Sequence, residues 1–452
     1  MKNSIKRVQS ESSLSALSSV RILREAKNIF QYILMAVAVV VTASCSNELD
    51  EALQPANNDT LQFVVSDFPM FGEGIQTRVI GTQDEGKTAW ENGDQIIVTL
   101  ISQKYGEQAV ALTYNGSSWS TEASLSYLEN ETPSVSVFYA PCYEVTEEGV
   151  MQLRSGMQLG MTEYLSGNYE IENGIMTITF EGAIRDYSRL RIAGLENQTL
   201  TVTTTDFTPA GATSVATEPY TLTTDEKGNA YLYGTFAEGA TVKVKKGDVT
   251  LTDYTFTFTT ELIQSYALDA RPVIDGTLGG KTEATEDDIT ALVEQLKGYV
   301  DNGITTIIVL GSQPATIDMG LWINTAIGEA IYRLSEEESY DGKIDLILPD
   351  VTEIVDQEFD GAHALNSINL PKVTTVGDGA FYDCQYLEEL AFGSVVTAIN
   401  HNTRAEFYRV GGKVEGCDLV LNREQVNAEA DYQPNIETRT WWNTEWKSIT
   451  LK

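Results

Sequence analysis

Side chains that carry out covalent or acid–base chemistry are scarce in this sequence of 452 residues. Only His363 and His401 carry imidazoles, and neither has a Ser, Cys or Asp at a spacing typical of a catalytic site. No glycine-rich phosphate loop opens a helix after a strand, and no Cys-x-x-Cys or His-x-x-x-His pair occurs. A hydrolase based on two carboxylates stays open, although no spacing singles out a pair. We therefore expect a non-enzymatic protein with no cofactor and no metal ion.

The net charge of the chain excludes some classes of binding partner. The formal net charge is -35, and removing residues 1–44, with six basic and two acidic groups, leaves 24 basic against 63 acidic groups, or -39. Phosphate backbones would repel such a chain, so we expect no nucleic-acid partner. We interpret the acidity as a soluble, non-adhesive exterior. Divalent-cation binding is the alternative, but no compact Asp-x-Asp-x-Asp-Gly loop occurs.

The N-terminal segment has the pattern of a secretion signal. Lys27 precedes an apolar run at residues 29–41, and the small residues Ala43 and Ser44 lead directly into Cys45. A Cys in this place resembles the lipobox of bacterial lipoproteins. The resemblance implies a signal peptide over 1–44, a palmitate-type lipid on Cys45 and a tether over 45–59 that reaches an outer membrane. An ordinary membrane anchor followed by an incidental Cys is the alternative.

The mature chain retains Cys142, Cys384 and Cys417. An odd number argues against a disulfide framework, so we predict buried free thiols. A bridge between Cys384 and Cys417 is the alternative.

Short alternating runs separated by turns dominate residues 61–273, as in Met176–Phe180, Val242–Lys245 and Tyr254–Phe258. One apolar and one polar face are typical of antiparallel, half-buried sheets. The fold class we predict is therefore mainly β with a smaller α/β part. The spacing of the turns predicts two tandem β-sandwich modules at residues 60–165 and 166–275.

Three segments of this region resemble fimbrillin-like proteins. They are Thr77-Arg78, Lys87–Val98 with its Trp-x-x-Gly-Asp turn, and Tyr114–Trp119; in the second module, 186–192 is also similar to this family. We expect Trp90 to fill the end of a sandwich, Gly93 to permit the turn and Asp94 to cap it.

The resemblance implies a role connected with pili, in which Arg78 would be the site of proteolytic maturation. An ordinary surface Arg is the alternative reading of Arg78. Polymerising members lend a strand from a free C-terminal end, whereas this chain continues well beyond the second module into a further region. We therefore expect an anchor, a tip subunit or a stand-alone surface protein.

A linker at 276–284 precedes a different pattern. Thr285 and Asp288 predict a capped helix with an apolar face, followed by a strand at 304–310 and a second helix around 321–334. We expect this βα-like unit to cap the array that follows, within a region spanning 285–452.

From Leu346 the sequence repeats itself at a constant offset. Leu348–Ile354 matches Leu370–Val376, and Phe359 matches Phe381. A third copy begins at Val396, one position late. The pattern, notably at 376–384, resembles BspA-like leucine-rich repeats and predicts a short solenoid with Phe381, Cys384 and Leu387 pointing inward.

Trp441, Trp442 and Trp446 lie close together near the end of the chain. They are candidate ligand contacts, because aromatic faces stack on sugars, and the alternative is packing within a C-terminal cap.

Together these features predict a surface-exposed outer-membrane lipoprotein, an adhesin or ligand-binding protein whose repeat face binds a host or bacterial protein or glycan ligand. The alternative is a structural fimbrial component, anchor or tip, that assembles with pilin subunits.

Overall fold

The structure is a computed structural model that describes residues 62–69, 87–127, 131–172, 175–180, 185–312, 315–317, 323–400 and 407–452. The described chain is mainly β, as predicted, and it contains several sheets and two α-helices. The signal segment 1–44, Cys45 with the tether 45–59, Arg78 and His401 lie outside the described residues. No helix in the described part has the length and apolarity needed to cross a membrane.

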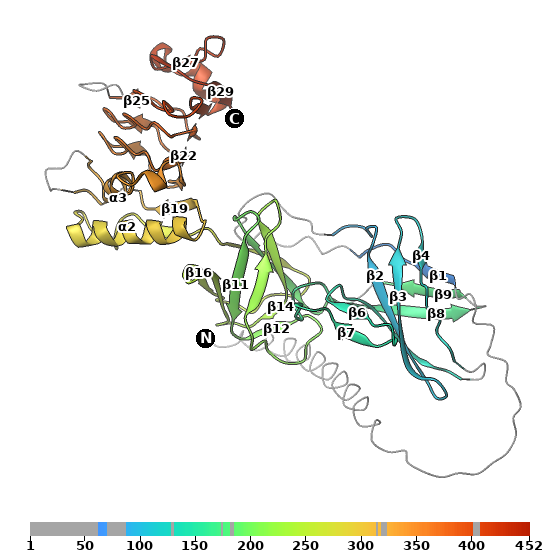
Figure 1. Ribbon diagram of the computed structural model, residues 1–452. Coiled ribbons are helices and arrows are strands. Elements are labelled where there is room, and N and C mark those ends of the chain that lie inside the picture. Colours follow the sequence, from blue (N-terminus) through green and yellow to red (C-terminus); the bar gives the residue numbers. More distant parts are fainter. Residues whose placement is uncertain are drawn as a thin grey trace, which may run out of the picture.

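The first module is built around one seven-stranded sheet in the order β1-β9-β8-β5-β2-β3-β4 (Figure 1). Its two edge strands, β1 and β4, come close to each other, so the sheet curls around its own core instead of forming the two facing sheets predicted. β1 pairs with β9 in parallel, and the remaining pairs are antiparallel. The strands are β1 (Gln62–Val65), β2 (Gln95–Ser102), β3 (Gly106–Tyr114), β4 (Trp119–Ser120), β5 (Ser134–Tyr139), β8 (Leu165–Glu172) and β9 (Ile175–Thr179), with the hairpin β6 (Tyr143–Val145) and β7 (Met151–Leu153) outside this sheet.

Trp90 is central to the aromatic core of this module, as the sequence predicts. Its ring lies edge-on to Phe68, Trp119 and Tyr139, with centroids 4.9, 5.0 and 5.2 Å away. Edge-to-face contacts are the favoured geometry for aromatic pairs. The turn after it is also as expected, because Gly93 has a φ of +95° and the Glu91 amide donates to Asp94 Oδ2 at 2.6 Å.

The predicted boundary at residues 165/166 is wrong. It falls at the start of β8, and both β8 and β9 belong to the sheet of the first module. The first module therefore extends to about Phe180. The error arises because β1 and β9 are far apart in sequence and yet pair, for example Phe63 with Met176, and turn spacing carries no information about such pairing.

The second module has two four-stranded sheets, β12-β14-β10-β17 and β13-β11-β15-β16. Inward residues of both sheets, among them Leu200, Leu232 and Val242, share one core. The strands β11, β14 and β15 alternate buried with half-buried or exposed residues, the pattern that the sequence indicated. The strands are β10 (Ser188–Ala193), β11 (Thr199–Thr204), β12 (Phe207–Pro209), β13 (Tyr220–Thr223), β14 (Asn229–Phe236), β15 (Thr241–Lys246), β16 (Val249–Thr255) and β17 (Ser265–Asp269).

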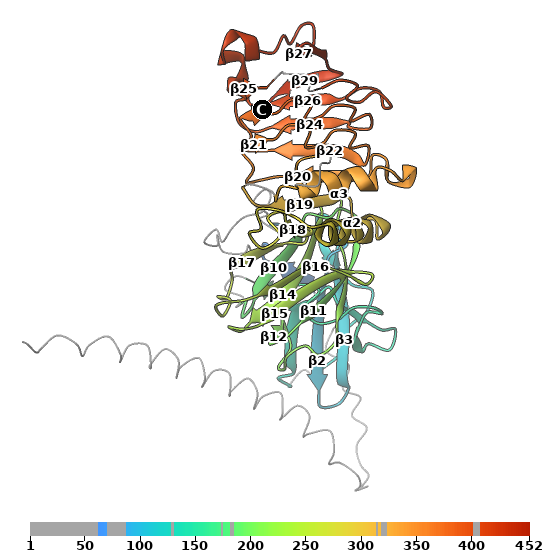
Figure 2. The ribbon, with the colours of Figure 1, turned by 90° about the vertical axis from the view of Figure 1, so that its left-hand side faces the viewer.

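The C-terminal region is dominated by a seven-stranded parallel sheet, whose strands lie one above another (Figure 2). Its first strand, Val273–Asp275, pairs with the strand Thr306–Leu310, so this region begins at about 273 and not after the predicted linker 276–284. A three-stranded parallel sheet, β21-β23-β25, accompanies it. The strands are β18 (Val273–Asp275), β19 (Thr306–Leu310), β20 (Ile344–Ile347), β22 (Leu365–Leu370), β24 (Glu389–Phe392), β26 (Asp418–Leu421) and β29 (Ser448–Leu451), then β21 (Glu353–Ile354), β23 (Thr375–Val376) and β25 (Ala398–Ile399), and the hairpin β27 (Thr440–Trp441) and β28 (Thr444–Glu445).

Two helices, α2 (Glu286–Asp301) and α3 (Ala326–Leu334), pack against each other near the start of this sheet. The predicted capping box is present, because Thr285 accepts a hydrogen bond from the Asp288 amide and the Asp288 side chain accepts one from the Thr285 amide. The second helix starts later than the predicted 321, at Ala326, with Thr325 as its N-cap.

The second module and the parallel sheet share one continuous hydrophobic core. The β15–β16 turn lies against the C-terminus of α2, where a Cβ on Gly247 would come within 2.5 Å of Asn302 Oδ1. Figure 1 shows the second module between the first module and the parallel sheet. The second module thus supports the C-terminal region through packed side chains in addition to the covalent chain.

Residues at equivalent positions of successive repeats are neighbours in the parallel sheet. Leu346 pairs with Ile368, and Ile368 pairs with Leu390. The later steps along the sequence are longer, since Leu390 pairs with Leu419 and Leu419 with Ile449. The strands of successive chain segments therefore lie one above another, and we refer to the described residues of 344–452 as the coil array.

Candidate ligand-binding surface

The three C-terminal tryptophans, which the sequence singled out as candidate ligand contacts, are not a shared open platform. Trp441 and Trp446 keep only 1% and 2% of their surface exposed and pack against Phe407, with ring centroids 5.7 and 5.3 Å away. Trp442 is half-buried and stacks on Tyr432 at 5.3 Å. Burial excludes Trp441 and Trp446 from ligand contact. They close the end of the array, as the packing alternative states.

The three cysteines of the described chain are free and buried, as predicted. Cys384 and Cys417 form no disulfide. The Cys384 thiol donates a hydrogen bond from Sγ to the Phe359 carbonyl oxygen at 3.0 Å. Burial raises the pKa of both thiols. Protonated, enclosed thiols are poor nucleophiles and poor metal ligands, so these cysteines belong to the core.

Turns that follow Phe359, Phe381 and Phe407 reach the surface of the array, where Tyr408 and Arg409 are exposed. The second residue after each Phe has a left-handed backbone, with φ of +70° at Gly361, +61° at Asp383 and +59° at Arg409. The turns are joined by backbone hydrogen bonds, from the Gly361 amide to the Tyr382 carbonyl at 2.8 Å and from the Asp383 amide to the Tyr408 carbonyl at 2.7 Å. Equivalent positions of the three turns are therefore in register.

Two tyrosines occupy the same position of successive turns, directly after Phe381 and Phe407. The rings of Tyr382 and Tyr408 stack with centroids 5.0 Å apart and planes 26° apart. Tyr408 keeps 51% of its surface exposed despite this contact. A large exposed aromatic ring fixed by a stacking neighbour is a feature of binding surfaces.

Polar groups surround this pair. Asp383 Oδ1 lies 3.0 Å from Arg409 Nη1, and Asp383 Oδ2 accepts a hydrogen bond from Gln385 Nε2 at 3.2 Å. His363 Nε2 is 3.7 Å from Asp383 Oδ2 and 3.4 Å from Gln385 Nε2. We call Tyr382, Asp383, Tyr408, Arg409 and His363 the tyrosine face.

The tyrosine face is not apparent from the repeat in the sequence, because Tyr382 and Tyr408 are further apart than the offset that relates Phe359 to Phe381. The signal available was the repeated dipeptide Phe381-Tyr382 and Phe407-Tyr408.

The sequence predicts no catalytic-type partner for His363, and the structure corrects this by placing Asp383 beside it. The groups around His363 are a carboxylate, an amide and the ring of Tyr386, at 5.8 Å, and none of them is a nucleophile of the Ser or Cys type. This arrangement suits binding.

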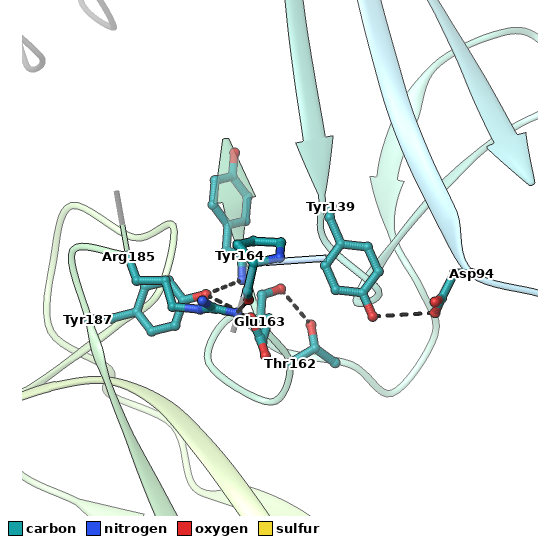
Figure 3. A network of polar contacts seen from close by, with 8 residues as sticks. Asp94, Tyr139, Thr162, Glu163, Tyr164, Arg185 and Tyr187 are labelled. Carbon is teal, nitrogen blue, oxygen red and sulfur yellow. Dashed lines mark hydrogen bonds and ion pairs between the residues drawn. The ribbon is translucent and has the colours of Figure 1, made fainter. Parts of the chain in front are cut away.

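A second polar network lies where the first module meets the second (Figure 3). Arg185 donates to Glu163 Oε2 from Nε at 3.1 Å and from Nη2 at 2.8 Å, and Tyr187 Oη donates to the same oxygen at 3.4 Å. Burial raises the pKa of Glu163, and the charge of Arg185 opposes that rise. Arg185 Nη2 also donates to the Pro69 carbonyl at 2.6 Å. These side chains are buried and paired with one another, so the network holds the joint and is not a ligand site.

Comparison with known proteins yields little. No protein-family model matches the chain, and no curated protein matches it. Among solved structures, the chain has a likeness to a protein from Bacteroides fragilis NCTC 9343 that is described provisionally as a cell adhesion protein. The match has 10% sequence identity, covers 47% of this chain and 92% of that one, and has a TM-score of 0.27. A likeness this low carries no argument about fold or function.

Proposed function

We propose that this chain is a non-enzymatic ligand-binding protein of the cell surface, anchored by a lipid on Cys45, with the tyrosine face as its binding surface. The observation that carries the proposal is the stacked pair Tyr382–Tyr408, in which Tyr408 is exposed and Tyr382 half-buried, on turns held in register by backbone hydrogen bonds. Binding sites on rigid elements need less ordering when a ligand arrives, which favours affinity.

We also propose that the coil array is a leucine-rich repeat solenoid similar to the BspA-like class. The parallel pairing of Ile368 with Leu346 on one side and Leu390 on the other supports this. The inward residues Phe381, Cys384 and Leu387, all fully buried, support it as well.

The two β modules would be fimbrillin-like and would act as a spacer between the membrane and the array. The Trp90 core and the Glu163–Arg185 joint support that role, because the first packs the interior of the first module and the second ties the two modules together.

The experiment that tests surface display uses intact bacteria expressing the full chain and a Cys45→Ala variant. Protease added to intact cells should remove the wild-type array, while a periplasmic control protein stays intact. Cys45→Ala should shift the chain from the membrane fraction to the soluble fraction. Full protection of the wild-type array on intact cells would contradict the proposal, as would unchanged membrane association of the variant.

The alternative proposal is a fimbrial anchor or tip subunit, and the build of the first module is what favours it. Within the described chain, that module is a single curled sheet with short edge strands, β1 and β4, that come close without pairing. An open seam of this kind offers backbone groups to a partner strand. Mass spectrometry of purified fimbriae separates the two proposals. Co-purification with a mature end at Val79 supports the fimbrial role, and a lipidated Cys45 end without pilins supports the ligand-binding role.

A further inference from the structure

We infer that the tyrosine face binds a neutral sugar chain, with one pyranose ring lying on Tyr408. This inference rests on the proposed function and names the ligand class for the same surface. It follows from three properties of the surface. The ring of Tyr408 is exposed, the polar groups beside it are held in fixed positions, and the charges of Asp383 and Arg409 cancel each other.

The ring of Tyr408 is positioned as a platform. One of its faces stacks on Tyr382, and 51% of the residue surface nevertheless remains exposed. Because Tyr382 covers one face, we place the ligand on the side of the ring that is turned away from Tyr382. The face of an aromatic ring is electron-rich, so it attracts the weakly positive C–H groups on the apolar side of a pyranose. Because Tyr382 holds the ring in place, little side-chain freedom is lost on binding.

The polar groups beside the platform match the hydroxyl groups of a sugar. Arg409 is exposed and supplies a planar set of donors, and Asp383, whose Oδ1 is enclosed, holds the guanidinium in place. The two are paired at 3.0 Å, and the left-handed backbone at both residues fixes where their side chains begin. Gln385 and His363 hold the other carboxylate oxygen. Groups oriented in this way discriminate between hydroxyl positions.

Charge argues against an acidic glycan. Arg409 is neutralised by Asp383, so its charge is already compensated within the face. The chain as a whole carries a formal charge of -35, which repels polyanions. A protein partner is also disfavoured, because a stable interface buries about 800 Å² on each side around an apolar centre. Two tyrosines surrounded by charged side chains fit a small polar ligand better.

The test is calorimetric titration of the purified full chain with neutral hexasaccharides of β-linked glucose, xylose and galactose and of α-linked mannose. Acidic probes are sialyllactose and a polygalacturonate fragment. We expect at least one neutral probe to bind, and Tyr408→Ala to weaken it by about ten-fold or more. Tyr408→Phe keeps the ring and should stay within about two-fold of wild type. Tyr105→Ala, which removes a tyrosine 40% exposed on the first module, is the matched control and should change nothing.

Three outcomes would overturn the inference. They are no binding of any neutral probe, tighter binding of an acidic probe, and neutral binding that Tyr408→Ala leaves unchanged. Failure here is distinguishable from failure of the proposed function. If protease removes the array from intact cells and a protein ligand is captured through the tyrosine face, the proposed function stands and only the ligand class is wrong.

Discussion

Phe359 and Phe381 stack inside the array with ring centroids 5.7 Å apart and planes 19° apart, although they belong to different repeats of the sequence. Phe407 continues the stack at 5.9 Å from Phe381. The residue after Phe381 and the residue after Phe407 form the stacked tyrosine pair of the tyrosine face. The buried stack therefore sets the spacing of the surface on which the proposed function depends.

Phe381→Ala should destabilise the protein strongly, because it removes the middle ring of this stack from a fully buried site. We expect a loss of about 3–5 kcal/mol in the free energy of unfolding, measured by chemical denaturation. The control is Tyr408→Ala, an exposed position that loses only its stack on Tyr382, so the change should stay below about 1.5 kcal/mol. A loss below about 1 kcal/mol for Phe381→Ala would mean that the coils do not stack in this way.

Gly377→Ala tests how closely successive coils approach. A Cβ at this position would lie 2.4 Å from the Asp356 amide nitrogen and 2.5 Å from the Val355 carbonyl carbon, both backbone atoms of the preceding coil. We expect a cost of about 1–3 kcal/mol or more in unfolding free energy. Gly298→Ala is the matched control, since it lies within α2 with nothing within 4 Å, and it should instead stabilise by about 0.5–1 kcal/mol. Equal effects of the two substitutions would contradict the close approach.

Glu358 should make stability depend on pH. It is fully buried, its Oε2 accepts a hydrogen bond from the Val355 amide at 3.1 Å, and burial raises its pKa from 4.5 to about 7. In the unfolded chain the group loses its proton near pH 4.5, whereas the folded protein retains it up to about pH 7. The contribution of Glu358 to stability is therefore highest below pH 4.5 and falls as the pH rises to about 7.

Glu358→Gln cannot ionise, so its unfolding free energy should rise relative to that of wild type as the pH increases over that interval. The difference between the two proteins should change by about 3 kcal/mol from its value at low pH. Denaturation at pH 4.5, 6 and 8 measures this difference. Glu336→Gln, at an exposed site next to α3, is the control and should leave the pH dependence unchanged. A constant difference between Glu358→Gln and wild type at all three values would refute the assignment.

Replacing one partner of the Glu163–Arg185 pair should destabilise the protein strongly, whereas replacing both partners together should destabilise it much less. Both side chains are buried, with 6% and 3% of their surface exposed. Arg185→Met leaves Glu163 without its partner and should cost about 3–5 kcal/mol. The double variant Glu163→Gln/Arg185→Met removes the stranded carboxylate and should recover a large part of that loss. Thermal unfolding of wild type, the two single variants and the double variant measures the coupling, and additive effects would show that the pair does not act as a unit.

The sequence predicts much of the architecture where the chain repeats or alternates. The repeat that relates Phe359 to Phe381, the cap at Thr285 and the turn at Gly93 are local or periodic features, and the structure contains each of them. Pairings between distant segments leave no such trace. The parallel pairing of β1 with β9 moves the first boundary, and the pairing of β18 with β19 moves the second.

The candidate site was harder to predict than the fold. Insertions lengthen the array after β24, so the step from Glu389 to its partner Asp418 is longer than the step from Ser367 to Glu389. A search at one period therefore loses register, so that only the repeated Phe-Tyr dipeptide relates Tyr408 to Tyr382, although the two rings stack in space. The prediction of ligand contacts at the tryptophans was wrong for Trp441 and Trp446, which are buried in the core. Aromatic residues that lie close together in the sequence give no information about their burial.

Retention of intact bacteria on surfaces coated with the neutral hexasaccharides tests the central claim most directly, because it requires display, an ordered array and the tyrosine face together. Cells carrying the wild-type chain or Tyr105→Ala should be retained. Cells carrying Tyr382→Ala/Tyr408→Ala at equal surface abundance should wash off. Equal retention of the double variant and wild type would contradict the account.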